Sequence, residues 1–184
     1  MPIKTPICDF GQAAKSFELK STNNEIINLN NVRGDNGALI MFICNHCPYV
    51  IAVIKDIIED YKNLKELGIK AVAICSNDSI NYPDDSFDKM IKFHKDHNFN
   101  FPYLIDETQE IAKSYGAVCT PDFFGYNKKL ELQYRGRIRE LKNLKPMETG
   151  ESDLFKAMKQ IAETGSGPKD QIPSMGCGIK WLDN

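Results

Sequence analysis

The hydrophobic and polar positions of the first half of the chain follow two different patterns. Residues 38–43 form a continuous apolar run of strand length, which is typical of a central strand buried on both faces. Over residues 48–67, apolar side chains recur every three or four positions opposite charged ones, which predicts an amphipathic helix. Gly68 follows as a C-cap glycine would, and residues 70–76 predict a second buried strand. A strand–helix–strand run of this kind implies a parallel pair of strands.

Shorter segments with turn residues between them make up the rest of the chain. The polar stretches that separate them are rich in Asn, Gly, Pro and Lys, which favours tight connections. The predicted elements are a hairpin (16–20 and 25–29), a helix (87–97), a short strand (103–105), a short helix (107–115), a hairpin (122–126 and 130–134) and a last amphipathic helix (153–164).

The order of these elements predicts an α/β chain. A parallel βαβ half followed by an antiparallel ββα half is the layout of the thioredoxin-like fold, with a central mixed sheet flanked by helices. This chain adds an N-terminal β-hairpin and an inserted strand/helix region to that layout. We expect a single domain over residues 1–165, followed by a Gly-, Pro- and Ser-rich linker and tail over 166–184.

Composition limits the binding partners and the cellular compartment that we expect for the protein. The 184 residues carry a net charge of −2, so there is no basic footprint for nucleic acid. No apolar run approaches the roughly 20 residues that span a bilayer, and the first residues lack the layout of a signal peptide. We therefore expect a cytoplasmic protein that binds neither nucleic acid nor membrane. In a reducing cytosol, six cysteines favour catalysis or metal binding over a disulfide framework.

Two cysteines stand where the central strand ends and the amphipathic helix begins. Unpaired N–H groups and the helix dipole at that point favour a thiolate, so the pKa values of Cys44 and Cys47 are expected to lie in the range of roughly 3.5–7.5. His46 lies between them and is a candidate to stabilise the thiolate. A Cys-x-x-Cys pair in this position indicates a redox motif, and structural or zinc-binding cysteines are the alternative.

The sequence leaves the roles of the two thiols open. Disulfide exchange needs one attacking thiolate and a second thiol that resolves the mixed disulfide. We favour Cys44 as the nucleophile and Cys47 as the resolving thiol. Pro48, however, disfavours helical dihedrals at Cys47 and itself fits a first helical turn. A helix that begins at Pro48 would place Cys47 at the cap, with the lower pKa.

A second candidate element, Cys119-Thr120-Pro121, directly precedes the predicted second hairpin. In thioredoxin-like folds a cis-proline at this strand faces the Cys-x-x-Cys pair, and the backbone beside it pairs with an incoming peptide. We therefore assign Pro121 to the catalytic site, and Thr120 and Cys119 to the substrate groove. An ordinary trans-proline is the alternative. Cys119 itself is a third redox thiol, a metal ligand or a small buried strand residue.

Other polar residues are assigned less specifically. Asp78, Asp84 and Asp85 are expected to form a polar loop at the rim of the site, because they lack the EF-hand pattern. The alternating Arg135, Arg137 and Arg139 are expected to be exposed surface charges. The remaining cysteines are Cys75, which we expect in the core, and Cys8 and Cys177, which the sequence does not place relative to the site.

The string CNHCPYV at residues 44–50 resembles the active-site string of a bacterial thioredoxin-like family in the redoxin, or alkyl hydroperoxide reductase and thiol-specific antioxidant (AhpC/TSA), superfamily. The resemblance covers nearly the whole chain and implies a thioredoxin-like fold and a thiol oxidoreductase with poorly defined substrates. The further matching strings are SND (76–78), YPDDS (82–86), FPYL (101–104), DETQ (106–109), CTPDFF (119–124), YRGRI (134–138) and GC (176–177).

The sequence thus predicts a thiol–disulfide oxidoreductase without a cofactor, which acts on disulfides of proteins or small molecules and uses an unidentified thiol electron donor. One alternative is a thiol peroxidase that reduces hydroperoxides through a sulfenic acid. Peroxiredoxins carry a threonine three residues before the peroxidatic cysteine, and here those positions hold Met41 and Cys44. The other alternative is a copper(I)- or zinc-binding module that uses Cys44, Cys47, Cys119 and His46.

Overall fold

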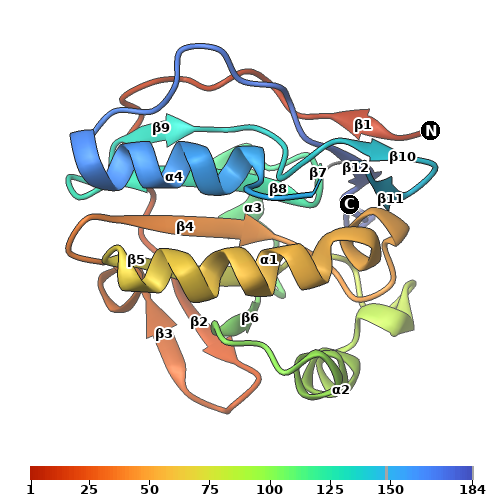
Figure 1. Ribbon diagram of the computed structural model, residues 1–184. Helices are drawn as coiled ribbons and strands as arrows, with labels where there is room; N and C mark the ends of the chain where they lie inside the picture. The colour runs from red at the N-terminus through yellow and green to blue at the C-terminus, as the bar shows by residue number, and fades with distance from the viewer. Residues whose placement is uncertain (148, 184) are drawn as a thin grey trace.

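The computed structural model describes residues 1–147 and 149–183, which fold around one large β-sheet (Figure 1). The helices are α1 (Pro48–Glu66), α2 (Phe87–His97), α3 (Glu110–Tyr115) and α4 (Asp153–Thr164). The strands are β1 (Ile3–Lys4), β2 (Glu18–Ser21), β3 (Ile26–Asn28), β4 (Gly37–Phe42), β5 (Ile69–Cys75), β6 (Tyr103–Ile105), β7 (Cys119–Thr120), β8 (Asp122–Asn127), β9 (Leu132–Tyr134), β10 (Leu141–Lys142), β11 (Lys145–Pro146) and β12 (Met175–Gly178).

The main sheet has seven strands in the order β3-β2-β6-β5-β4-β8-β9. Strand β4 lies inside it, parallel to β5 on one side and antiparallel to β8 on the other, so that Ile40 faces Val72 and Phe124. Every residue of β4 is buried, which explains why this segment is apolar throughout. The predicted parallel pair, the mixed sheet and the N-terminal hairpin of β2 and β3 are therefore confirmed.

Helices cover both faces of the sheet. Side chains of β4 alternate between the faces, with Leu39 and Met41 in one core cluster and Ile40 and Phe42 in the other. Helices α1 and α4 lie side by side over the first face, and α3 packs on the second (Figure 1). This arrangement fixes the start of α1 at the carboxyl end of β4, which is where the paired cysteines lie.

Most predicted elements match the structure closely. The bounds predicted for α2, β6 and α4 agree with those observed. Helix α3 begins at Glu110, three residues later than predicted, because Gln109 takes the left-handed conformation with φ of 64° at its N-cap. Of residues 1–147 and 149–183, no helix is long and apolar enough to cross a membrane.

Two of the three alternating arginines differ from the expectation of exposed surface charge, whereas Arg137 is only partly buried and lies 2.7 Å from Asp153. Arg135 and Arg139 are each only 8% exposed. Arg135 lies 2.9 Å from Asp122 of β8, and Arg139 lies 3.2 Å from Asp56 of α1. The expectation was wrong for both residues because their acidic partners become neighbours only when β8 and α1 pack beside the chain that follows β9. Both arginines thus form ion pairs within the fold.

The C-terminal segment packs onto the body of the protein. Strand β12 pairs with β7 on one side and with β1 on the other. These strands meet at the end of the molecule where α1 begins (Figure 1). Ile179, just beyond β12, is buried in the second core cluster. The division into a domain (1–165) and a tail (166–184) stays a prediction, but the position of β12 brings the tail to the candidate site.

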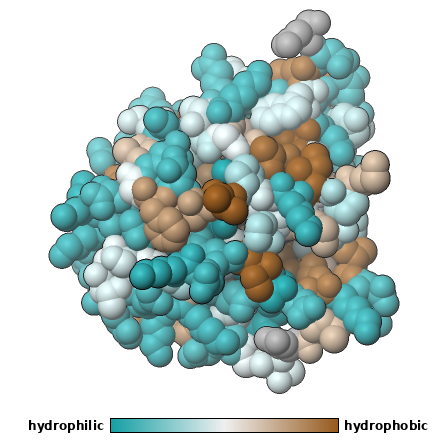
Figure 2. Space-filling model, turned by 90° about the horizontal axis from the view of Figure 1, so that it is seen from above, coloured by the Kyte–Doolittle hydropathy of each residue, from teal (hydrophilic) through white to brown (hydrophobic). Residues whose placement is uncertain are grey.

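The surface seen from above carries no continuous apolar area among the described residues. Figure 2 shows that brown, hydrophobic groups on this face are small and are separated by hydrophilic ones. Isolated exposed apolar side chains are normal for a globular protein. This face therefore offers no extended hydrophobic docking surface.

Candidate active site

The local fold places Cys47 at the N-terminus of α1. The helix begins at Pro48, and Cys47 is its N-cap residue with an extended backbone conformation. The carbonyl of Cys47 accepts hydrogen bonds from the backbone N–H groups of Val50 and Ile51, both at 3.0 Å. Proline fits this position because it lacks the N–H that a first helical residue leaves unpaired. Of the two arrangements left open by the sequence, the structure has the one with Cys47 at the cap.

The two thiols of the Cys-x-x-Cys pair are buried against strand β7. Cys44 is 1% exposed and Cys47 is 0% exposed, and they hydrogen-bond to each other. The Sγ of Cys44 lies 3.3 Å from the Thr120 hydroxyl, and the Cys47 thiol, when protonated, donates to the Thr120 carbonyl at 3.2 Å. Thr120 thus contacts both sulfurs.

The environment separates the pKa values of the two thiols. A hydrogen bond from Cys44 lowers the pKa of Cys47 to about 5, although burial acts in the opposite direction. Hydrogen bonds from Cys177 contribute to this lowering. The pKa of Cys44 is raised, because its thiol donates to Cys47, because it is buried, and because the Asp85 carboxylate is close. These opposite shifts favour a thiolate on Cys47 over one on Cys44.

Asp85 joins the predicted rim loop to the cysteine pair. Its buried carboxylate lies 2.7 Å from Nδ1 of His46 and accepts hydrogen bonds from the backbone N–H of Asn45 at 2.8 Å and from the Asn77 amide at 2.7 Å. The ligand atoms of Cys44, His46 and Asp85 all lie within 4.8 Å of one another. Asp85 therefore holds the imidazole of His46 beside Cys44.

The second predicted element also lies at the site. The Thr120–Pro121 peptide bond is cis, as predicted, and it joins β7 to β8. Cys119 is fully buried, and its Sγ lies 3.8 Å from the Pro121 carbonyl. Burial raises the pKa of the Cys119 thiol. Of the three readings of Cys119, these observations favour a small buried strand residue.

Sequence reasoning missed Cys177 as a member of this site. Strand β12 places Cys177 directly opposite Thr120 on β7, and its thiol hydrogen-bonds to Cys47. Burial and this bond raise the pKa of Cys177 to about 11. The sequence carries two signals here: the GC string at residues 176–177 matches the family, and the glycines on either side of Cys177 allow close backbone approach, but neither reveals what Cys177 approaches.

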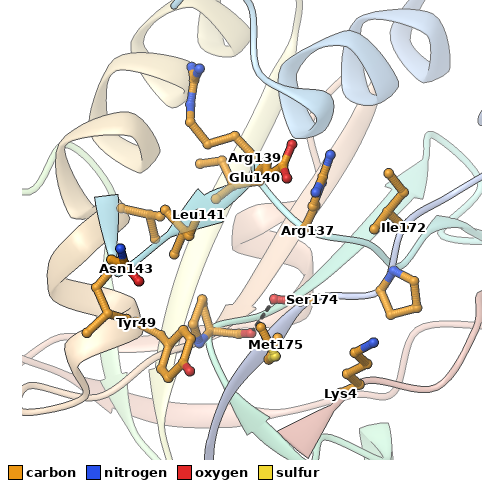
Figure 3. A pocket seen from close by; sticks show the side chains of 15 residues that line it. Lys4, Tyr49, Arg137, Arg139, Glu140, Leu141, Asn143, Ile172, Ser174 and Met175 are labelled. Atoms are coloured by element: carbon orange, nitrogen blue, oxygen red, sulfur yellow. Dashed lines mark hydrogen bonds between the residues drawn. The ribbon is translucent and has the colours of Figure 1, made fainter. Parts of the chain in front are cut away.

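A pocket of about 490 Å³ opens beside Pro121 (Figure 3). It is lined by Tyr49 of α1, by Ser174 and Met175 of the C-terminal segment, and by Arg137. The Ser174 hydroxyl donates to the Pro121 carbonyl at 2.8 Å, the contact drawn as a dashed line. Neither Cys44 nor Cys47 is among the described residues that line this pocket. It adjoins the site without forming its reactive centre.

A buried cysteine pair at a helix N-terminus, facing a cis-proline strand, defines a thioredoxin-like protein. The chain belongs to the AhpC/TSA family, whose model matches residues 10–141.

Solved structures share the fold of this chain. An uncharacterized conserved protein from Geobacillus kaustophilus is 35% identical, with a TM-score of 0.94 over 100% of this chain and 98% of that one. The thioredoxin domain of a thiol-disulfide oxidoreductase from Bacteroides vulgatus is 14% identical, with a TM-score of 0.59 over 73% of this chain and 89% of that one.

A third structure, the peroxidoxin BcpB from Mycobacterium tuberculosis, is 16% identical, with a TM-score of 0.54 over 67% of this chain and 81% of that one. The comparison with curated proteins found no match. The thioredoxin-like fold predicted from the sequence is confirmed.

Because the pKa of Cys47 is lowered and that of Cys44 is raised, we can predict the pH at which the first thiolate forms. The reduced protein should gain its first thiolate, measured by ultraviolet absorbance near 240 nm, with a midpoint near pH 5, because Cys47 is ionised above its pKa. Cys47→Ser should remove this step, and Cys8→Ser should keep it. A first thiolate that forms only above about pH 8, the ordinary range for cysteine, would show that Cys47 is not activated.

Proposed function

We propose that this protein is a thiol–disulfide oxidoreductase that works through Cys44 and Cys47. The observation that carries the proposal is the hydrogen-bonded thiol pair at the N-terminus of α1, with the pKa of Cys47 lowered to about 5. A thiolate that exists at neutral pH beside a second thiol is what disulfide exchange requires. Membership of the AhpC/TSA family and the fold shared with a thiol-disulfide oxidoreductase support the same class of reaction.

The geometry supports a two-step exchange. The Cys47 thiolate attacks one sulfur of a substrate disulfide, so a Cys47–substrate bond forms, the substrate S–S bond breaks, and the leaving sulfur takes up a proton. Cys44 then loses its proton, for which His46 is the nearby acceptor, and attacks Cys47. This step forms the Cys44–Cys47 disulfide and releases the second substrate thiol, so two electrons and two protons reach the substrate.

In this mechanism Cys44 and Cys47 have the opposite roles to those that the sequence favoured. We infer that Cys47 attacks and Cys44 resolves, because α1 begins at Pro48 and Cys47 therefore lies at the helix N-terminus. The negative charge of Asp85 and burial both keep the proton on Cys44. The roles of His46, Pro121 and Thr120 as site residues are part of the same proposal.

The proposal also covers the substrate, the electron donor and the cellular compartment. The substrate is a protein or small molecule with a disulfide, and an unidentified thiol compound returns the protein to its reduced state. The cytoplasm, where thiols are kept reduced, suits such a cycle. We propose no nucleic-acid or membrane partner.

A redox titration tests the proposed function. Equilibration with mixtures of reduced and oxidised glutathione, followed by acid quenching, alkylation and mass spectrometry, should show a reversible Cys44–Cys47 disulfide. Cys75 should stay a thiol, because it is buried and its pKa is raised to about 12. If no reversible disulfide involves Cys44 or Cys47 across the titration, the proposed function is wrong.

A metal-binding module is the second candidate, because one observation favours it. Cys44, His46 and Asp85 offer sulfur, nitrogen and oxygen ligands within 4.8 Å of one another, which is a donor set that zinc accepts. Cys119 is outside this group, so the ligand set differs from the predicted one. This candidate requires that the protein retains one zinc or copper(I) ion and that His46→Ala weakens retention. A protein that keeps neither ion after loading excludes it.

The thiol peroxidase stays an alternative reaction for the same thiolate. A low pKa at Cys47 also suits attack on a hydroperoxide, which would give a sulfenic acid that Cys44 then converts to a disulfide. The rates of thiol loss with peroxide and with a disulfide substrate separate the two reactions.

A further inference from the structure

The C-terminal segment occupies the sheet edge beside the cis-proline. Strand β12 runs antiparallel to β7, with Cys177 opposite Thr120 and Gly178 opposite Cys119. The backbone N–H of Ile179 donates to the Val118 carbonyl at 3.1 Å, which extends the pairing. An extended segment added to a free strand edge is a general way for proteins to bind peptides. The chain therefore holds its own C-terminal strand as an added peptide would be held.

A close backbone approach fixes this strand at the site. A Cβ atom at Gly176 would lie 1.9 Å from the Thr120 carbonyl oxygen, so only glycine fits there. Beyond β12, the Lys180 carbonyl accepts hydrogen bonds from the backbone N–H of Asp78 and from the Gln109 side chain, both at 2.8 Å. The strand is thus held at both ends, and Cys177 has a defined position between these contacts.

That position brings a third sulfur to the cysteine pair. Cys177 faces Thr120, whose carbonyl oxygen lies 3.2 Å from the Sγ of Cys47. The Cys177 side chain packs against the core cluster that contains Cys44 and Cys47. Cys177 is partly exposed, whereas the other two sulfurs are buried. A reductant that approaches from solvent therefore meets Cys177 first.

We infer that Cys177 is a third redox thiol, which exchanges with the Cys44–Cys47 disulfide and carries it to the surface of the protein. This inference rests on the proposed function, because it needs that disulfide to form. It assigns the partly exposed Cys177 as the point at which the thiol electron donor acts.

The exchange moves a disulfide without net oxidation. Cys177 loses its proton and attacks the Sγ of Cys47, so the Cys47–Cys177 bond forms and the Cys44–Cys47 bond breaks. The electron pair leaves on the Cys44 sulfur, which takes up a proton. A donor thiolate then attacks the Cys177 sulfur and releases Cys47 as a thiolate. A second donor thiol displaces the first from Cys177, which completes a two-electron reduction.

The low pKa of Cys47 suits the second of these attacks, by the donor on the Cys177 sulfur. A thiol of low pKa leaves a disulfide faster than one of high pKa. Cys47, rather than Cys177, is therefore the better leaving group when the donor reaches the Cys47–Cys177 disulfide from solvent. Cys8 is also partly exposed, but it packs in the second core cluster, on the other face of the sheet, and so provides a matched control.

Disulfide mapping in cysteine variants tests the inference. Reduced Cys44→Ser protein, treated with oxidised glutathione, quenched with acid and analysed by mass spectrometry, should contain a Cys47–Cys177 disulfide in most molecules. In Cys177→Ser, the Cys44–Cys47 disulfide should still form, but dithiothreitol should reduce it at least roughly tenfold more slowly than in the wild type, because no exposed sulfur carries it. Cys8→Ser should behave as the wild type in both measurements.

Two different results would separate the failure of the inference from that of the proposed function. If Cys47 of Cys44→Ser stays joined to glutathione while Cys177 stays a free thiol, and Cys177→Ser is reduced at the wild-type rate, the inference is wrong and the proposed function stands. If the wild type forms no reversible disulfide at Cys44 or Cys47, both are wrong. A circular dichroism spectrum equal to that of the wild type shows that each variant is folded.

Discussion

Cys47→Ser is expected to slow the reduction of a disulfide substrate by at least about a thousandfold, because it removes the attacking thiolate. Serine has nearly the size of cysteine, but its hydroxyl is not ionised at neutral pH and forms no disulfide. The loss should appear in the first, single-turnover reaction of the reduced protein, followed by the release of the substrate thiol. The fold should persist, because the Cys47 backbone still caps α1.

Two variants make this result specific. Cys8→Ser should keep the wild-type rate, since Cys8 packs against the second core cluster, whereas Cys44 and Cys47 belong to the first. Cys44→Ser should keep the first step, in which the substrate thiol is released, because Cys44 acts only afterwards. If Cys47→Ser kept more than a tenth of the wild-type rate while Cys44→Ser lost the first step, Cys44 would be the nucleophile, as the sequence alone favoured.

Arg135→Met is expected to lower the free energy of unfolding by about 3–5 kcal/mol at pH 8, because it leaves a buried carboxylate without its partner. Arg135 lies 2.9 Å from Asp122, whose side chain is fully buried. Burial already raises the pKa of Asp122, and the arginine acts in the opposite direction. Without the arginine, Asp122 should bind a proton more readily, so the loss should become smaller as the pH falls toward 5. Urea unfolding at both pH values measures the effect.

An exposed ion pair provides the control for this experiment. Lys92 and Asp96 form a contact on the surface of α2, where solvent screens both charges. Lys92→Ala should therefore change the free energy of unfolding by less than about 1 kcal/mol. If Arg135→Met cost no more than Lys92→Ala at pH 8, the buried pair would not stabilise the fold as described.

The elements of the fold could be predicted where the signal is local. The apolar run of β4 and the helical spacing of α1 each lie within one continuous segment, and the predicted bounds differ from the observed ones by about one residue. Burial against both faces of a sheet or against one face of a helix gives each element its own periodicity. The start of α3 was missed because the left-handed conformation of Gln109 has no such periodic signal.

The candidate site could be predicted only in part for the same reason. Cys44 and Cys47 are recognisable because they lie at the junction of two predicted elements, and Pro121 because proline restricts its own backbone. Asp85 was expected in a loop at the rim of the site, but its contact with the Asn45 backbone and the position of Cys177 arise only through the folding of that loop and of the C-terminal strand. Their positions depend on pairing between segments far apart in the sequence, and no local pattern encodes that pairing.

The choice between the cysteine roles shows where the structure changed the chemistry. The sequence allowed a helix start near Asn45 or at Pro48, and these two starts favour different thiols. The observed start at Pro48 and the charge of Asp85 both favour the thiolate on Cys47. The proposed function is unchanged by this difference, but the two thiols exchange roles: Cys47 attacks the substrate and Cys44 resolves the mixed disulfide.

One measurement tests the central claim most directly. The fully reduced, metal-free protein is mixed with hydrogen peroxide and, separately, with a disulfide substrate, and the rate of thiol loss and the resulting cysteine pairing are determined. The account predicts fast oxidation by the disulfide, slow oxidation by peroxide, and a first disulfide between Cys44 and Cys47. Fast consumption of peroxide through a sulfenic acid, with slow reaction toward the disulfide, would contradict it and make the protein a thiol peroxidase.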